Sequence, residues 1–277
     1  MKLAVEIWGS RGSVATPGAA TVRYGGNTTC ISVRSAAGDL VIIDAGTGIR
    51  KLGRCLMAET PRAEINLFLT HFHWDHIQGL PFFAPLIQGG AKVCFHAGVP
   101  PAQSLARLQR QMSDPFFTLD FNAAKANCEF LQMENAAVRC GALTVEAFPL
   151  NHPQGAWGYR IECAGAAVVV ATDVEHGDPT LDIVLRERSH NADLLIYDAQ
   201  YTDAEYATRV GWGHSTARAA AQVAADANVK NLLLSHHDPE HDDSTMDEIV
   251  AATRKLFPAT NGACEGAVIA IPGTFSI

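Results

Sequence analysis

Long hydrophobic runs are absent from the sequence. No stretch reaches the roughly 20 apolar residues that a membrane-spanning helix needs. Residues 1–8 form a short apolar run that is interrupted by charge and has no small-residue cleavage site, so they predict a first strand and not a signal peptide. We therefore expect a cytoplasmic protein that does not associate with a membrane.

Cysteine pairs at the spacing of zinc fingers are absent as well. The seven cysteines are odd in number and scattered, and no two of them form a CxxC pair. This pattern argues against a disulfide framework and against a zinc site built from thiolates. Any metal site would then rely on other residue types.

Positive charge is scarce, because 21 Lys and Arg stand against 29 Asp and Glu, for a formal net charge of −8. Broad binding to nucleic acid depends on cations that neutralise phosphates, so extended nucleic acid is not an expected partner, although a local basic patch stays open. Hydrophobic residues make up 48% of the chain, enough to bury a core. With no linker rich in Pro, Gly or Ser, we predict one domain over residues 1–277.

The pattern of short β-rich runs and helical segments indicates an α/β (α+β) chain. Two strand-rich halves, each ending in helices, favour a β-sandwich with helices on its outer faces. The predicted strands lie near 2–8, 29–35, 40–44, 65–70, 91–96, 143–148, 157–163, 166–172, 193–198, 230–235 and 266–271, and the predicted helices near 77–88, 101–112, 179–190, 215–228 and 244–256.

The segment His71–His76, which reads His-Phe-His-Trp-Asp-His, follows a strand that looks buried and precedes a helix. In an extended stretch alternate side chains point the same way, so His71 and His73 can share one metal ion. The chain then turns, and Asp75 and His76 can face a second metal. The alternative is a group of unrelated surface histidines.

Three later segments place further ligand types at strand ends. They supply His152 after Leu150, Asp173 after an apolar run, and His236 after Ser235. Taken singly, His152 could be a loop histidine and Asp173 a helix or turn cap. Together they provide what a two-metal site needs, and imidazole with carboxylate ligands suits two Zn²⁺ ions, with Mn²⁺ or Fe²⁺ as alternatives.

On these residues the chain resembles the metallo-β-lactamase superfamily, whose five motifs occur here in order over nearly the whole length. The resemblance implies a four-layer αββα sandwich and a strand-end carboxylate, Asp44, that orients the histidine loop. His237 remains an alternative to His236 as the last ligand. The implied ligands are His71, His73 and His152 for one metal, Asp75, His76 and His236 for the other, and Asp173 as the bridge.

A finer resemblance is to the phosphodiesterase branch that contains ribonuclease Z. Gly213-His214-Ser215-Thr216 precedes an Ala-rich helix as in that branch, and the resemblance implies that His214 donates a proton to the leaving oxygen. Asp198 could orient His214 and raise its pKa, and the alternative for His214 is a solvated loop residue. The segments Gly9–Ser13 and Tyr24–Cys30 also look like the opening of this group, or are structural loops. Members are often dimers, so a homodimer is possible.

The chain also departs from ribonuclease Z. It reads Tyr197-Asp198-Ala199-Gln200 where that family has His-Glu-Ala-Thr, His237-Asp238-Pro239 where it has Ser-x-Arg-Tyr, and it shows no Gly/Pro-rich basic arm. We therefore expect a small-molecule substrate, such as a cyclic or other small nucleotide-type phosphodiester, and not tRNA. Phe116 and Phe117 could form an aromatic wall against a base, or pack in the core.

The predicted function is thus a metal-dependent hydrolase, with Asp75 accepting the proton of the attacking water while His214 and Asp198 serve the leaving group. Two alternatives stay open at this point. The same ligands would serve hydrolysis of a carbon ester, lactone, thioester or β-lactam, and a non-catalytic metal-binding sensor would also keep them.

Overall fold

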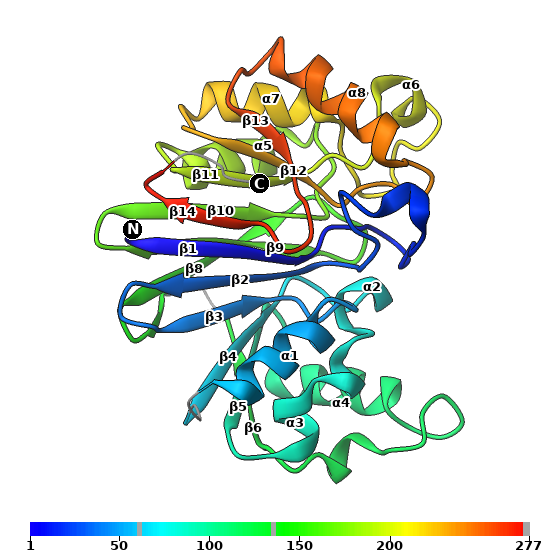
Figure 1. Cartoon of the computed structure of the whole chain (residues 1–277), viewed down its shortest axis with the longest axis vertical. Helices are drawn as coiled ribbons and strands as arrows, with labels where there is room; N and C mark the ends of the chain where they lie inside the picture. The colour runs from blue at the N-terminus through cyan, green and yellow to red at the C-terminus, as the bar shows by residue number, and fades with distance from the viewer. Residues whose placement is uncertain (60–62, 134–136, 274–277) are drawn as a thin grey trace.

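The computed structural model describes residues 1–59, 63–133 and 137–273. Two seven-stranded sheets lie face to face in the middle of the molecule, with helices on both outer sides (Figure 1). The first sheet has the order β14-β1-β2-β3-β4-β5-β6. Its strands are β1 (Leu3–Gly9), β2 (Cys30–Ser35), β3 (Leu40–Ile43), β4 (Glu64–Leu69), β5 (Lys92–Ala97), β6 (Asn127–Gln132) and β14 (Val268–Ile271).

The second sheet has the order β13-β12-β11-β10-β9-β8-β7. Strands β10 to β13 run parallel, so their carboxyl ends meet at one edge of the sheet. The strands are β7 (Val138–Cys140), β8 (Leu143–Leu150), β9 (Ala156–Cys163), β10 (Ala166–Ala171), β11 (Leu194–Asp198), β12 (Leu232–Ser235) and β13 (Thr260–Gly262).

Helices α1 (Ile49–Ala58), α3 (Ala84–Gln88) and α4 (Pro101–Gln111) cover the first sheet, and α5 (Pro179–Ser189), α7 (Ala217–Asp226) and α8 (Asp243–Arg254) cover the second (Figure 1). Short helices α2 (Trp74–Ile77) and α6 (Asp203–Tyr206) lie in loops. Three buried apolar clusters separate the layers, one between the sheets and one under each group of helices. This arrangement confirms the predicted four-layer αββα sandwich.

The predicted helix near 77–88 is wrong. The structure divides this stretch into the end of α2, a short 3-10 turn at Leu80–Phe82, and α3. Pro81 and Pro85 each lack the N–H that a continuous helix would use, so an unbroken helix cannot form there. The sequence analysis also missed α1, α6, β6, β7 and β13 among the described elements.

Strand β14 shows that the two sheets are not simply the two halves of the chain. It comes from the C-terminal part yet pairs antiparallel with β1, with Val5 opposite Ile269. The last strand therefore completes the sheet that the first strand begins.

Polar residues gather where strands β3, β10 and β12 end. Asp44, Asp173 and His236 follow these strands, and each has a positive φ of about 60° (62°, 60° and 61°). This left-handed conformation is costly for residues other than glycine, and it persists where the surrounding structure enforces it. The sharp turn ends each strand and leaves its polar side chain at the shared edge.

Arg11 fixes the N-terminal loop against the loop that follows β12. Its guanidinium is fully buried and donates to the carbonyl oxygens of Gly25 (2.8 Å), Asp238 (2.9 Å) and His241 (2.6 Å). The backbones also meet, because Gly12 N–H donates to His237 O at 3.0 Å. One side chain thus holds the connection between β1 and β2 against the loop between β12 and α8.

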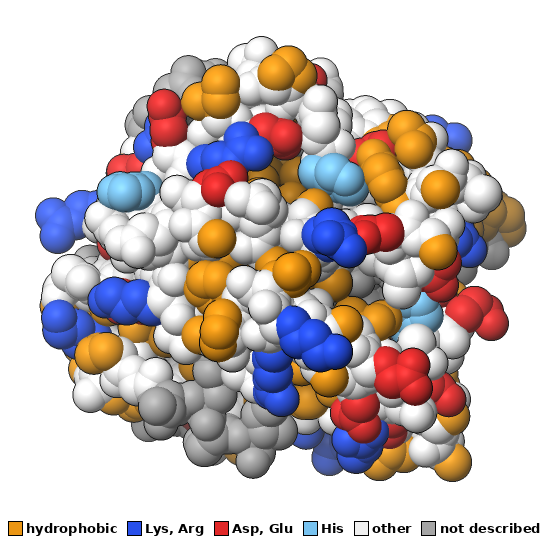
Figure 2. All heavy atoms as spheres, turned by 90° about the horizontal axis from the view of Figure 1, so that it is seen from above, with side chains coloured by type: hydrophobic (Ala, Val, Ile, Leu, Met, Phe, Trp, Pro, Cys, Tyr) orange, Lys and Arg blue, Asp and Glu red, His pale blue; other side chains and the backbone are white. Residues whose placement is uncertain are grey.

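The surface carries charges of both signs. Seen from the end that bears α7 and α8, basic and acidic side chains lie intermingled, and no large area of one sign covers this face (Figure 2). None of the helices in the described parts of the chain has the length and hydropathy to cross a membrane.

Replacing Arg11 with Met should lower the free energy of unfolding by about 3 kcal/mol or more, because three buried carbonyl groups lose their donors. Urea unfolding followed by circular dichroism measures the change. The control is Arg218→Met, whose side chain is 69% exposed and whose ion pair should contribute little. Equal unfolding midpoints for the two variants would show that Arg11 does not hold the loops.

Candidate metal centre

A first cluster of three imidazoles comes from two loops. His71 and His73 follow β4, and His152 follows β8. Nδ1 of His73 and Nε2 of His152 lie 3.3 Å apart, and Nε2 of His71 has no hydrogen-bond partner among the described residues. The three side chains offer one nitrogen each to a common point.

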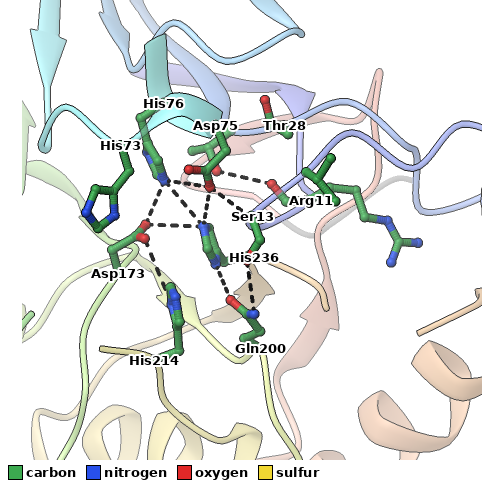
Figure 3. Close-up of polar contacts among 12 residues, drawn as sticks. Arg11, Ser13, Thr28, His73, Asp75, His76, Asp173, Gln200, His214 and His236 are labelled. Atoms are coloured by element: carbon green, nitrogen blue, oxygen red, sulfur yellow. Dashed lines mark hydrogen bonds and ion pairs between the residues drawn. The ribbon is translucent and has the colours of Figure 1, made fainter. Parts of the chain in front are cut away.

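A second, buried cluster lies beside the first, and Figure 3 shows it next to His73. It joins Asp75 and His76 of α2 to Asp173 and His236. Nε2 of His76 is 3.0 Å from Asp173 Oδ2 and 3.2 Å from Asp75 Oδ2, while Nε2 of His236 is 3.2 Å from Asp75 Oδ2. Asp173 also reaches toward the first cluster, because its Oδ1 is 3.8 Å from His71 Nε2.

The outward-facing nitrogens fix which atoms are free for a metal. His152 Nδ1 donates to Gly213 O at 2.8 Å, and His73 Nε2 lies 2.9 Å from Gln154 Oε1. The remaining nitrogens, Nδ1 of His73 and Nε2 of His152, therefore each carry a lone pair, and they face each other at 3.3 Å. Two lone pairs at this distance repel each other unless a cation lies between them. The donor set of the first cluster thus fits a metal ion that prefers imidazole.

The rings of the second cluster are held in the same manner. His76 Nδ1 lies 2.7 Å from Asp44 Oδ2, and His236 Nδ1 lies 2.9 Å from Gln200 Oε1. Asp44 in turn accepts the backbone N–H of Thr70 at 2.8 Å, so the carboxylate itself is fixed. Such outer partners orient the ligands of protein metal sites.

Buried carboxylates control the charge of the second cluster. Burial by itself lowers the pKa of His236, but Asp173, Asp75 and Asp198 outweigh it and raise the pKa to about 9. Burial and the neighbouring His76 hold the pKa of His71 well below its usual range. The second cluster therefore attracts positive charge, as protons or as a metal ion, whereas His71 stays neutral and ready to bind metal.

His214 and Asp198 lie next to this second cluster. Nδ1 of His214 donates to Asp198 Oδ2 at 2.9 Å, and the same carboxylate accepts the backbone N–H groups of Asp173, Gln200 and Ser215 at 3.1–3.2 Å. Four donors occupy the Asp198 oxygens, which suits an orienting group better than a metal ligand. The structure thus brings Asp198 and His214 together, and the hydrogen bond to Asp198 uses Nδ1 of His214 and not Nε2.

His237, the alternative to His236, points elsewhere. Its Nε2 donates to Ala263 O at 2.8 Å, and burial lowers its pKa to about 3. The ring packs edge-on against Tyr24, at 5.6 Å between centroids, and takes no part in either cluster. The geometry favours His236 as the ligand.

The N-terminal loop also contacts the second cluster. Ser13 N–H donates to Asp75 Oδ2 at 2.8 Å, and Gln200 Nε2 lies 3.2 Å from Ser13 Oγ (Figure 3). A Cβ atom at Gly12 would collide with the imidazole of His236, whereas the Arg11 guanidinium points away from the cluster. The loop Gly9–Ser13, for which the sequence left two interpretations, therefore packs directly on the candidate ligands.

A pocket of about 740 Å³ opens beside the first cluster, within the range of small-molecule sites. Its lining includes His71 and His73 together with Phe116 and Phe117. Phe116 is 73% exposed and so does not pack in the core, whereas Phe117 is half-buried, packs against the apolar cluster under α1, α3 and α4, and meets Phe82 edge-on. Both rings line the pocket, and the aromatic wall against a base stays a prediction.

The structure brings all the predicted ligands and both accompanying residues to one edge of the sandwich. Sequence analysis missed several partners of these residues, namely Thr70, Gln154, Gln200 and the carbonyl of Gly213. Gln200 lies two residues after Asp198 and Gly213 directly before His214, but neither an amide side chain nor a backbone carbonyl follows a spacing rule that would have marked it. The others could be found only from the fold.

Replacing Gly12 with Ala should displace His236 and weaken metal binding at the second cluster, because the added methyl group occupies the space of the ring. Metal content of the purified protein, measured by mass spectrometry after equilibration with Zn²⁺, should fall toward one equivalent. Gly18→Ala is the matched control, since nothing lies near a Cβ at that position. Two equivalents in both variants would contradict the assignment of His236.

The sequence and fold of this chain can be compared with those of known proteins. The ribonuclease Z of Brevibacillus brevis (strain 47) is 39% identical over 102 residues, which cover 35% of this chain and 30% of that protein. The ribonuclease Z of Bradyrhizobium sp. (strain ORS 278) is 28% identical over 81% of this chain and 88% of its own. The metallo-β-lactamase fold protein YhfI from Bacillus subtilis shares the fold with a TM-score of 0.72 and 19% identity, over 96% of this chain and 98% of its own.

A family model connects these likenesses to the site. The model described as the beta-lactamase superfamily domain matches residues 40–237, which begin before Asp44 and end just after His236. The match covers more than half of the 277-residue chain, and the expected resemblance is confirmed. The chain therefore belongs to the beta-lactamase superfamily and is a metallo-hydrolase of that fold.

Proposed function

We propose that the chain is a phosphodiesterase that hydrolyses a small or cyclic nucleotide-type phosphodiester with the help of two divalent metal ions. The observation that carries the proposal is the pair His214 and Asp198, joined at 2.9 Å and lying beside the two ligand clusters. A hydrolase that expels an alkoxide needs a proton donor at this point, and the pair provides one. The two ribonuclease Z relatives, whose name denotes cleavage of RNA phosphodiesters, support the same reaction class.

The ligand set determines which metals fit. One ion would be held by His71, His73 and His152, and the other by Asp75, His76 and His236. Asp173 would contact both ions. Imidazole and carboxylate ligands without thiolate favour Zn²⁺, with Mn²⁺ or Fe²⁺ as alternatives. When bound, two such ions would make a water molecule acidic near neutral pH and polarise the phosphoryl group.

The side chains around the ions then move the protons. Asp75, whose Oδ2 is fixed by Ser13 N–H, accepts the proton of the attacking water. The bond from phosphorus to the leaving oxygen breaks, and that oxygen takes a proton from Nε2 of His214. Asp198 accepts Nδ1–H of the same ring throughout, so it keeps the ring in the orientation that places Nε2 toward the leaving group.

The size of the pocket supports a small substrate. Its volume of about 740 Å³ suits a nucleotide-sized molecule, and the net charge of −8 disfavours a long polyanion. A homodimer, the cytoplasmic location and a single domain over 1–277 stay predictions of the sequence.

Zinc-loaded protein should hydrolyse bis(p-nitrophenyl) phosphate and leave nitrocefin and a simple lactone intact. Chelation with EDTA should abolish the release of p-nitrophenolate, and added Zn²⁺ or Mn²⁺ should restore it. Preferred hydrolysis of nitrocefin or the lactone would overturn the phosphodiesterase in favour of carbon-centred hydrolysis. Inactivity on the whole panel would favour a metal-binding sensor.

Replacing His214 with Ala should lower kcat for adenosine 2′,3′-cyclic phosphate by about 10²–10⁴-fold, the usual contribution of a positioned acid. The loss should be much smaller for bis(p-nitrophenyl) phosphate, because p-nitrophenolate leaves without protonation. Metal content should not change, and His190→Ala, at an exposed helix end, is the control. An equal loss on both substrates would remove His214 from the role of proton donor.

A further inference from the structure

Two arginines of α4 line the pocket beside the first cluster. Arg107 and Arg110 stand three residues apart, so they share one face of the helix with Gln111, which also lines the pocket. The same pocket includes His71 and His73, so a molecule that fills it can reach the candidate metal centre and both guanidinium groups together.

Neither guanidinium has an acidic partner within the described ranges 1–59, 63–133 and 137–273. Arg107 lies over the ring of Phe72, at 4.8 Å from its centroid, and Arg110 makes no side-chain hydrogen bond or ion pair there. Most of the other arginines with recorded side-chain contacts pair with carboxylates, as Arg23, Arg34, Arg160, Arg186, Arg188 and Arg218 do. Arg107 and Arg110 therefore face the pocket with no carboxylate partner among the described residues, and both can bind an anion that enters it.

The lining of the pocket favours an anion with an aromatic part. Its described lining contains no carboxylate, and it contains the rings of Phe72, Trp74, Phe82 and Phe117 besides the two arginines. Arginine forms paired hydrogen bonds to phosphate, and aromatic rings stack on nucleobases. Gln111 is already held by a hydrogen bond to Ile77 O at 2.8 Å, which keeps this face of α4 against the histidine segment.

We propose that Arg107 and Arg110 form a subsite for a second anionic group of the substrate, so that the enzyme prefers a nucleotide-type phosphodiester that also carries a terminal phosphate. The inference rests on the proposed function. The scissile diester lies at the histidine clusters, the terminal phosphate at α4, and the base or sugar against the aromatic rings between them. A substrate with a single negative charge would leave the two guanidinium groups without a partner.

Adenosine 2′,3′-cyclic phosphate with and without a 5′-phosphate tests the subsite, because the two molecules differ only in the second anion. With the zinc-loaded protein, the 5′-phosphate should lower KM by about tenfold to a hundredfold, as charge-assisted hydrogen bonds would. The double variant Arg107→Gln/Arg110→Gln should lose this advantage through KM of the phosphorylated substrate. Each protein's value for the 5′-hydroxyl compound is its own baseline.

Arg50→Gln/Arg54→Gln is the matched control. These exposed arginines line a neighbouring surface pocket that carries Lys51 but no histidine, so the same charge is removed away from the clusters. The control should keep the full advantage of the 5′-phosphate. Equal KM values for the two substrates in the unaltered protein, or loss of the advantage in both double variants, would overturn the subsite.

Binding of adenosine 5′-phosphate separates the subsite from the proposed function. Isothermal titration of the zinc-loaded protein should give a Kd that rises at least about tenfold in Arg107→Gln/Arg110→Gln. If no phosphodiester is hydrolysed, the proposed function fails, and this titration alone decides the subsite. An unchanged Kd in the double variant would refute it.

Discussion

Buried negative charge is the constraint on which the site depends. Asp44, Asp75, Asp173 and Asp198 are all buried at one edge of the sandwich. Buried carboxylates persist only where hydrogen-bond donors or cations offset their charge. Asp44 and Asp198 receive that compensation from the protein, through backbone N–H groups and the rings of His76 and His214. Asp75 accepts one backbone N–H, from Ser13, but Asp75 and Asp173 also face the Nε2 atoms of His76 and His236, which metals would bind.

The strand ends fix the positions of Asp44, Asp173 and His236, while the loops that follow β4 and β8 and the short helix α2 supply the other ligands. Parallel strands bring their carboxyl ends to a common edge, and a left-handed residue after β3, β10 and β12 stops each strand at its polar side chain. The cost of that conformation is of order 1–2 kcal/mol for each residue. The packing of the apolar clusters on both faces of each sheet supplies the free energy that maintains the left-handed conformation of these residues. The geometry of the metal centre at the sheet edge therefore depends on the packing of the core.

Sequence reasoning succeeded where chemistry is concentrated in a few residue types. Histidine and aspartate at strand ends predicted both clusters, and short β-rich runs predicted most strands. It failed at the helix near 77–88, although Pro81 and Pro85 are a local signal against an unbroken helix. Strand pairing depends on tertiary context instead, and the sequence did not predict that β14 joins the same sheet as β1. It also could not choose between His236 and His237, because adjacent residues differ only in the direction that the backbone gives them. Arg107 and Arg110 belong to no recognised sequence motif. Only the fold shows that they line the same pocket as His71 and His73.

The pairing of β14 with β1, together with the contact of the N-terminal loop with the residues after β12, has a consequence for synthesis on the ribosome. A nascent chain that has emerged as far as residue 152 already carries the three imidazoles of the first cluster. It still lacks Asp173 and His236, and it also lacks β14, the edge strand of the first sheet. The two halves of the metal centre thus become available at different stages of translation, and the second can be assembled only after residue 236 has emerged.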